Sequence, residues 1–414
     1  MNEFTIIFLL FLIIGVVVQW LLGIRHMHHV RENRSAVPGA FVSHIPLDAH
    51  QKAADYTQAK VRLGLVELIA GTVILLVWTL GGGLQLLDST IRAYGLGTIT
   101  TGTIVILLFL FISGILDLPL SWYRAFRLEQ RFGFNKSTLS IFISDTVKHA
   151  IIGLLIGLPL ILLVLWIMDT AGSYWWFFVW ITWLGFSLFM MWAYPAFIAP
   201  LFNDFRPLKN EELKRRIENL LDRNGFTSNG IYVMDGSTRS THGNAYFTGL
   251  GANKRIVFFD TLIDELNPDE IEAVLAHELG HFKCNHIRKR IVTLGVVFLL
   301  GFALLGWLID KDWFYQGLGV ESASAYMALL LFVTISPVFT VFLQPVFSYI
   351  SRQHEFEADD FAAGQAQTEN LIKALVKLYK ENANTLTPDP VYSAFHDSHP
   401  PAPIRVAHLT AKTV

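Results

Sequence analysis

The chain has 414 residues, of which 53% are hydrophobic and only 16% are charged, and its mean hydropathy is +0.44. A soluble globular domain has about a quarter of its residues charged, so this deficit favours a membrane protein. The net charge of −2 excludes the basic surface that nucleic-acid binding requires. The single cysteine, Cys284, excludes an intrachain disulfide and a metal site built from several thiolates.

Several apolar stretches reach the roughly 20 helical residues needed to cross a membrane. These stretches are residues 4–22, 65–87, 99–121, 148–168, 174–200, 291–309 and 326–350. The first is too long, and too poorly flanked by positive charge, for a cleaved signal peptide. The sequence therefore predicts a mainly α-helical, polytopic membrane protein with about seven transmembrane helices.

Positive charge is unevenly distributed among the loops between these stretches. The loop after the first stretch carries Arg25, Arg31, Arg34, Lys52, Lys60 and Arg62. The loop after the third stretch carries Arg124, Arg127, Arg131, Lys136 and Lys148. The alternate loops 84–98 and 310–325 carry only Arg92 and Lys311. Because cytoplasmic loops carry the excess of Lys and Arg, the N-terminus is predicted outside and the C-terminus in the cytoplasm. Residues 201–290 and 351–414 then share one side and can meet.

The segment 201–290 is predicted to be a small α/β domain. The apolar spacing over residues 208–224 predicts a helix, with Gly225 at its end, and Asn267-Pro268-Asp269-Glu270 opens a second helix. The predicted strands are Ile231–Met234, Asn244–Phe247 and Arg255–Phe259, with a hairpin connection at Gly249–Lys254. The second helix is expected to continue through Arg288–Arg290 into the sixth stretch.

The chain accordingly divides into four parts. These are membrane helices one to five (1–200), the small α/β segment (201–290), membrane helices six and seven (291–350) and a C-terminal cytoplasmic segment (351–414).

The second helix carries the motif His277-Glu278-Leu279-Gly280-His281. Residues four apart lie on one face of a helix, so His277 and His281 can bind one metal ion. Zinc suits nitrogen and oxygen ligands, and a catalytic zinc has three protein ligands and one open position. Glu278, about 100° around the helix, can act as the general base toward a water at that position. The motif predicts one zinc ion per chain and hydrolysis of peptide bonds.

A third ligand is expected just after the seventh stretch, in residues 351–360, which are also predicted to be helical and cytoplasmic. Glu355 and Asp359 are again four residues apart. One can bind the metal while the other orients a ligand histidine by a hydrogen bond. The spacing does not decide between them. His354 and Glu357 point to other faces and are expected in solvent or in ion pairs.

These residues resemble those of the type 1 CAAX prenyl endopeptidases, integral-membrane relatives of the bacterial heat-shock membrane metalloproteases. The resemblance covers nearly the whole chain. It rests on the seven stretches, the zinc motif extended to His286, the block Glu355–Asp359, the run Asn244–Phe247, and Ser398–Pro401 with Arg405. The sequence departs from the family pattern at Cys284 and Glu357, where many members have an apolar residue and a glutamine. Neither departure is expected to touch the chemistry.

The resemblance implies that Glu355 is the third zinc ligand and that Asp359 orients a ligand histidine. It implies that a strand containing Asn244, Ala245, Tyr246 and Phe247 pairs with an extended substrate backbone. His399 and Arg405 would face the zinc and stabilise the oxyanion of the tetrahedral intermediate, with a structural clamp as the alternative role. The membrane helices of the family enclose a large water-filled chamber, which is expected here too.

The predicted function is that of a zinc endopeptidase in the lipid bilayer, acting as a monomer on peptide or protein substrates. Its substrates would be CAAX-type C-terminal peptides, with or without a prenyl group, or damaged membrane proteins. Compact loops and the lack of a C-terminal retention signal favour a bacterial inner membrane over the endoplasmic reticulum, with the active site toward the cytoplasm. A non-catalytic transporter or scaffold would not need Glu278.

Overall fold

The structure, a computed structural model, describes residues 2–226, 228–248 and 255–412. The predicted hairpin connection Gly249–Lys254 lies outside the described residues. Seven helices of the described chain are long and apolar enough to cross a membrane, which confirms the predicted number. They are α1 (Glu3–Glu32), α2 (Leu47–Trp78), α4 (Thr98–Tyr123), α6 (Leu139–Thr170), α7 (Trp175–Ala193), α11 (His286–Leu308), and α13 (Ala325–Thr340) joined through a 3₁₀ turn to α14 (Gln344–Gln365).

The predicted boundaries of the second span are wrong, because α2 begins at Leu47 and ends at Trp78 rather than covering residues 65–87. Three consecutive glycines reverse the chain after it. Gly82 has a φ of 75°, and a Cβ on Gly81 or Gly83 would lie 2.8 Å from the carbonyl oxygen of Val77. Only glycine accommodates this turn without strain. The short helix α3 (Gly83–Arg92) follows it.

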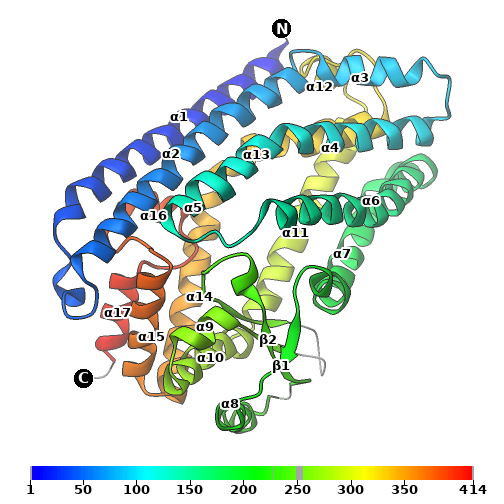
Figure 1. Ribbon diagram of the computed structural model, residues 1–414. Helices are drawn as coiled ribbons and strands as arrows, with labels where there is room; N and C mark the ends of the chain where they lie inside the picture. The colour runs from blue at the N-terminus through cyan, green and yellow to red at the C-terminus, as the bar shows by residue number, and fades with distance from the viewer. Residues whose placement is uncertain (1, 227, 249–254, 413–414) are drawn as a thin grey trace.

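One end of the helical array gathers the N-terminus and the loops predicted to share its side (Figure 1). The Asn2 amide donates a hydrogen bond to the carbonyl oxygen of Trp313 at 2.7 Å, next to the short helix α12 (Asp312–Gln316). The backbone N–H of Glu321 donates to the side-chain oxygen of Gln85 at 2.8 Å. The loops 84–98 and 310–325 therefore lie together, as the charge pattern requires.

The opposite end carries the small α/β domain. Its four strands are β1 (Phe205–Pro207), β2 (Ile231–Met234), β3 (Ala245–Thr248) and β4 (Arg255–Phe259), in the order β1-β2-β4-β3. β2 and β4 are parallel, and the two outer pairs are antiparallel. Sequence reasoning predicted β2 and β4 with the observed bounds and placed β3 one residue early. It missed β1, which is too short to show a period of two.

Helices pack around this sheet and bring distant segments to it. They are α8 (Glu211–Arg223), α9 (Asp260–Glu265), α10 (Pro268–Lys283), α15 (Thr368–Glu381) and α17 (Ala402–Thr410). α16 (Pro390–His396) packs instead on α1 and α14, and a one-turn α5 (Gln130–Phe132) lies between α4 and α6. Asn210 caps α8, and Gly225, with a φ of 59°, follows its end. Apolar side chains of α8, β4, α10 and α15 form one buried core, which includes Ile217, Phe258 and Leu275.

The start of α10 is as predicted, but its end is not. Asn267 and Glu270 form a reciprocal capping box, with Pro268 in the first turn. The helix ends at Lys283 and does not continue into the sixth span, because Asn285 adopts a left-handed conformation with a φ of 58°. A new helix, α11, begins at His286. This break changes where His286 points.

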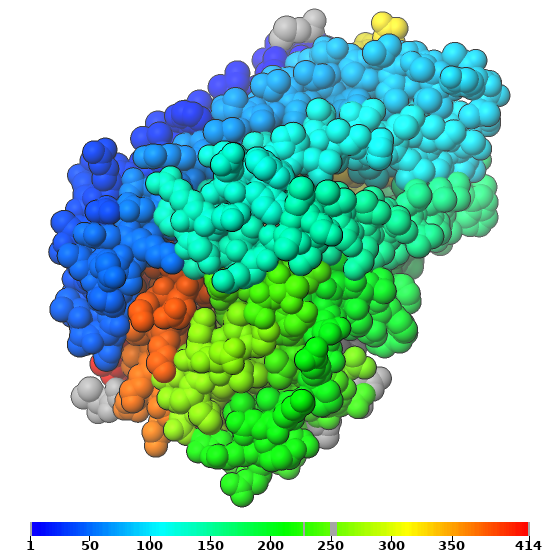
Figure 2. Space-filling view, in the orientation of Figure 1, coloured from blue at the N-terminus to red at the C-terminus, as the bar shows by residue number. Residues whose placement is uncertain are grey.

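The C-terminal segment returns to the N-terminal helices. In Figure 2 its orange residues fill the space between the blue N-terminal helices and the green α/β domain. The guanidinium of Arg25 on α1 pairs with Asp389 at 2.8 Å, and the ring of His26 stacks on that of Tyr392 with centroids 4.0 Å apart. The C-terminal segment therefore connects the membrane helices with the catalytic end.

Candidate active site

The predicted metal ligands converge from two helices. His277 and His281 lie one turn apart on α10, and their Nε2 atoms are 3.3 Å apart. Glu355 on α14 places its Oε2 3.5 Å from Nε2 of His277 and its Oε1 3.4 Å from Nε2 of His281. One ligand atom from each residue lies within 4.8 Å of the others. Glu355, and not Asp359, therefore faces both imidazole nitrogens.

The donor set fits a zinc ion. Oε2 of Glu355 is buried and accepts no hydrogen bond from any described residue. A buried carboxylate oxygen without a partner is unfavourable, and a cation bound there would satisfy it. Two imidazoles and one carboxylate also match the ligand types and number of a catalytic zinc site.

Gly280 lets the two ligand-bearing helices approach. A Cβ at this position would lie 2.9 Å from Cα and 3.0 Å from the carbonyl oxygen of Ala358 on α14. Those are backbone atoms, which cannot rotate away as a flexible side chain can. The close approach of α10 and α14 at Gly280 thus brings Glu355 within reach of the histidines one turn away.

A buried ion pair contacts His277 on the Nδ1 side of its ring, away from the metal position. Its Nδ1 lies 2.8 Å from Oδ1 of Asp359, whose side chain is fully buried. The guanidinium of Arg405 on α17 donates to both oxygens of Asp359, at 2.8 and 2.5 Å. Burial alone would lower the pKa of His277, but its contacts with Asp359 and Glu355 outweigh that effect and raise the pKa to about 9. Asp359 thus holds the Nδ1 side of His277 while Nε2 faces the metal position.

His281 has a corresponding support that the sequence analysis missed. Its Nδ1 lies 2.9 Å from Nδ1 of His286, and Nε2 of His286 lies 2.9 Å from Oε2 of Glu357. Lys289 donates to the same carboxylate at 3.1 Å, and the ring of His354 stacks on that of His286 at 4.1 Å. With a metal on Nε2 of His281, its Nδ1–H donates to His286, whose Nε2–H donates to Glu357.

This chain of hydrogen bonds corrects one expectation. Glu357 forms the predicted ion pair, but it is also connected through His286 to His281, a metal ligand. The expectation that Glu357 has no part in the chemistry of the site is therefore wrong. In a continuous helix, a residue five positions after His281 would point to a different face. The left-handed Asn285 redirects the chain so that His286 meets His281. The Asn285 side chain, a type that tolerates this conformation, was the available signal.

Glu278 lies next to His277 in a largely enclosed position. Burial raises the pKa of its carboxyl above the ordinary value, against the opposing effect of the His277 imidazole. A carboxylate with a raised pKa is a better proton acceptor than one in bulk water. Burial lowers the pKa of His281 to about 4.

The two C-terminal residues reach the site from different directions. Nε2 of His399 lies 3.3 Å from Oε1 of Glu355, and the His399 side chain is 66% exposed. Arg405 is buried, and its Nη1 lies 3.6 Å from Oε2 of Glu355. His399 therefore borders the open side of the site, whereas Arg405 lies beneath it.

The run Asn244–Phe247 forms the start of an edge strand. Residues Ala245–Thr248 of β3 pair only with β4 among the described strands, which leaves the other edge of β3 without a strand partner. The ring of Phe247 packs against Phe282 of α10, with centroids 5.2 Å apart. β3 therefore lies beside the catalytic helix with an edge to which a further strand could add.

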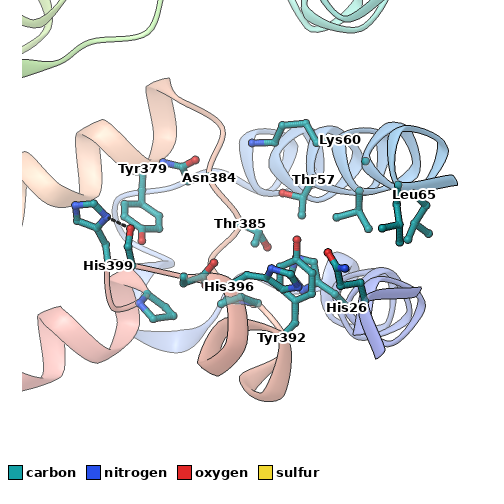
Figure 3. A pocket seen from close by; sticks show the side chains of 18 residues that line it. His26, Thr57, Lys60, Leu65, Tyr379, Asn384, Thr385, Tyr392, His396 and His399 are labelled. Carbon is teal, nitrogen blue, oxygen red and sulfur yellow. Dashed lines mark hydrogen bonds between the residues drawn. The ribbon is translucent and has the colours of Figure 1, made fainter. Parts of the chain in front are cut away.

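A pocket of about 600 Å³ borders His399 (Figure 3). Its walls come from α1, α2 and the segment Tyr379–Pro401. The large water-filled chamber that the resemblance implies stays a prediction.

Comparison with known proteins agrees with this geometry. Residues 26–204 match the family described as CAAX prenyl protease N-terminal, five membrane helices, and residues 207–413 match peptidase family M48. The chain is 33% identical over 403 residues to CAAX prenyl protease 1 of Saccharomyces cerevisiae, covering 91% of this chain and 89% of that protein. It is 40% identical over 295 residues to a CAAX prenyl protease 1 homolog of Arabidopsis thaliana, and this match covers 70% of this chain and 68% of that protein. A crystal structure of S. mikatae Ste24p superposes with a TM-score of 0.92 at 32% identity, covering 99% of both chains.

In the part of the chain that the structure describes, seven apolar helices, a small mixed sheet and the group His277, His281 and Glu355 define a membrane zinc metalloprotease. The chain belongs to the CAAX prenyl protease 1 family, as the sequence resemblance predicted. These relatives, and another in Homo sapiens at 32% identity, are eukaryotic proteins. They give no support to the bacterial membrane that the compact loops had favoured.

Proposed function

We propose that this protease hydrolyses CAAX-type C-terminal peptides, including prenylated ones, with one zinc ion held by His277, His281 and Glu355. The observation that carries the proposal is the convergence of two imidazole Nε2 atoms on a buried carboxylate with an unpartnered oxygen. A zinc ion bound there would polarise the scissile carbonyl and make a water more acidic. The relatives are named as CAAX prenyl proteases, which supports the substrate class.

In the proposed reaction Glu278 is the general base. It takes a proton from the attacking water and afterwards delivers it to the leaving amine. Its raised pKa suits both steps. His399 donates a hydrogen bond to the developing oxyanion, because it borders the open side of the site and reaches Glu355. Main-chain hydrogen bonds from the free edge of β3 hold the substrate as an added strand.

Arg405 differs from His399 in that most of its hydrogen bonds are made to Asp359. Two of its nitrogens are engaged by Asp359, and only Nη1 is directed toward Glu355. We therefore propose that Arg405 acts mainly by holding Asp359 against His277, and that His399 provides most of the oxyanion stabilisation expected of the pair.

The orientation and partners follow from the same reasoning. The loop charges support an active site on the cytoplasmic face of the membrane. The eukaryotic relatives support the endoplasmic reticulum rather than a bacterial inner membrane. The protein would act on its peptide substrate as a monomer. No feature of the described residues favours the alternative role in degrading damaged membrane proteins.

The test uses the purified full-length protein in lipid vesicles, with prenylated and unprenylated CAAX peptides. Hydrolysis should stop on addition of a chelator and return with zinc. Glu278→Gln should keep its zinc and lose about 10²–10⁴-fold in kcat. Glu218→Gln, at an exposed position on α8, is the matched control and should behave as wild type. Hydrolysis that is indifferent to the chelator, or that persists in Glu278→Gln, would overturn the proposal.

A further inference from the structure

The pocket beside His399 has walls of mixed chemistry. Thr57 and Lys60 of α2 lie on one side in Figure 3, and Tyr379, Asn384 and His399 lie on the other. Hydroxyl and amide groups of this kind hydrogen-bond a peptide, whereas an isoprenoid chain requires an apolar wall. The polar part of the lining, around Lys60 and His399, therefore suits a stretch of polypeptide.

Among the described residues that line this pocket, Lys60 is the only lysine or arginine. Its side chain is exposed to the cavity, and its ammonium lies 4.3 Å from the ring centroid of Tyr56. No ion pair shorter than 4.0 Å joins Lys60 to a carboxylate of the described residues, although the carboxylate of Glu129 acts on it at longer range and Asp397 also lines the pocket. An ammonium group that is partly enclosed by protein and has no counter-ion in direct contact is incompletely compensated, and an anionic ligand would stabilise it.

The opposite wall is held in place before any ligand binds. The ring of Tyr392 stacks on that of His26, with centroids 4.0 Å apart, and contacts the tilted ring of His396 at 4.4 Å. Asp389 caps the helix that carries Tyr392 and pairs with Arg25 of α1. A rigid wall reduces the conformational entropy that a ligand must lose on binding.

We propose that Lys60 binds the C-terminal carboxylate of the peptide segment that hydrolysis releases. This inference rests on the proposed function, because a CAAX peptide ends close to its scissile bond. A free carboxylate is the one charge that every peptide cut near its own C-terminus carries. Three extended residues span about 10 Å, and a 600 Å³ pocket is within the usual range for a ligand of that size. Lys60 would thus select substrates by the position of their chain end.

The first experiment compares two substrates with four proteins. One CAAX peptide has a free C-terminal carboxylate, and the other has the same sequence with a C-terminal amide. The wild type should cleave the acid with about tenfold higher kcat/KM than the amide, mostly through a lower KM. Lys60→Met should remove that preference by weakening cleavage of the acid alone. Lys60→Arg should restore part of it.

Arg62→Met is the matched control. Arg62 is an exposed cation two residues further along α2 and does not line the pocket. Its substitution should leave the preference for the acid unchanged. If the wild type cleaves both peptides equally, or if Lys60→Met slows both by the same factor, then Lys60 does not bind the C-terminal carboxylate and the inference is wrong.

A binding measurement separates this inference from the proposed function. The free tripeptide acid and its amide are titrated into the Glu278→Gln protein, which needs no hydrolysis. The acid should bind about tenfold more tightly, and the additional substitution Lys60→Met should abolish the difference. A preference in binding without hydrolysis by the wild type would overturn the proposed function alone. Hydrolysis without any preference in binding would overturn the role of Lys60 alone.

Discussion

Substitution of Gly280 by alanine tests whether the close approach of two helices places the metal ligands. Gly280 lies in α10 between the two histidines, and it faces Ala358 of α14. A methyl group there would lie 2.9 Å from Cα of Ala358, 3.0 Å from its carbonyl oxygen and 3.2 Å from Cβ of Phe361. Carbon atoms in contact prefer a separation of about 3.5–4.0 Å. The two helices must therefore move apart by roughly 0.5–1 Å.

That displacement is large for a metal site but modest for folding. Metal–ligand distances hold to within about 0.2 Å, so Glu355 would no longer complete the coordination with both histidines. We expect zinc affinity to fall about 10–100-fold. Alanine gains about 1 kcal/mol in helix propensity, and overpacking costs about 1–3 kcal/mol. The net loss of stability is therefore at most about 2 kcal/mol, and metal binding is the sharper measurement.

The assay measures the zinc content of the purified protein after equilibration in buffers of graded free zinc, together with thermal unfolding. Gly364→Ala is the matched control, because nothing lies within 4 Å of a Cβ at that position of α14. It should keep its zinc and be as stable as the wild type or up to about 1 kcal/mol more stable. If Gly280→Ala binds zinc as tightly as Gly364→Ala and remains active, the proposed dependence of the ligand geometry on this helix contact is refuted.

Three further outcomes are expected. His286→Ala should weaken zinc binding about tenfold or more, measured by competition with a chelator, because His281 loses the group that orients its Nδ1. Burial and nearby Glu381 raise the pKa of Glu265 to about 7. The stability of Glu265→Gln relative to wild type, measured by thermal unfolding, should therefore increase by on the order of 1 kcal/mol as the pH rises from about 5 to 8. Asp389→Ala should destabilise the protein by about 1–2 kcal/mol in the same assay, because it removes the cap of α16 and the partner of Arg25.

Each of these three predictions can be contradicted by a specific result. Glu357→Gln keeps an acceptor for His286, so it should impair zinc binding less than His286→Ala does, and equal losses would reject the orienting role. The folded pKa of Glu265 lies above its unfolded value, so the wild type loses stability as pH rises through about 7. A Glu265→Gln advantage at pH 5 that does not grow with pH would contradict that assignment. Unchanged melting of Asp389→Ala would show that the ion pair with Arg25 is dispensable.

The amino-acid sequence alone determined the features that depend on neighbours along the chain. Apolar stretches of membrane length appear as seven helices, and the Asn267–Glu270 capping box opens α10 where the residues predicted it. The four-residue spacing of His277 and His281 was enough to place both imidazoles on one face. Local patterns carry this information because helix period and capping involve residues within about one turn.

Other features required the tertiary structure. Glu355 and Asp359 have equivalent spacing in the sequence, and only the packing of α14 on α10 at Gly280 decided that Glu355 faces both Nε2 atoms. The role of His286 depended on one left-handed residue, Asn285, that interrupts an otherwise helical pattern. Lys60 was counted among the loop charges, yet it lines a pocket formed by segments more than three hundred residues apart in the chain. Contacts between such distant segments leave no periodic signal, because they depend on how whole helices pack and not on the order of adjacent residues.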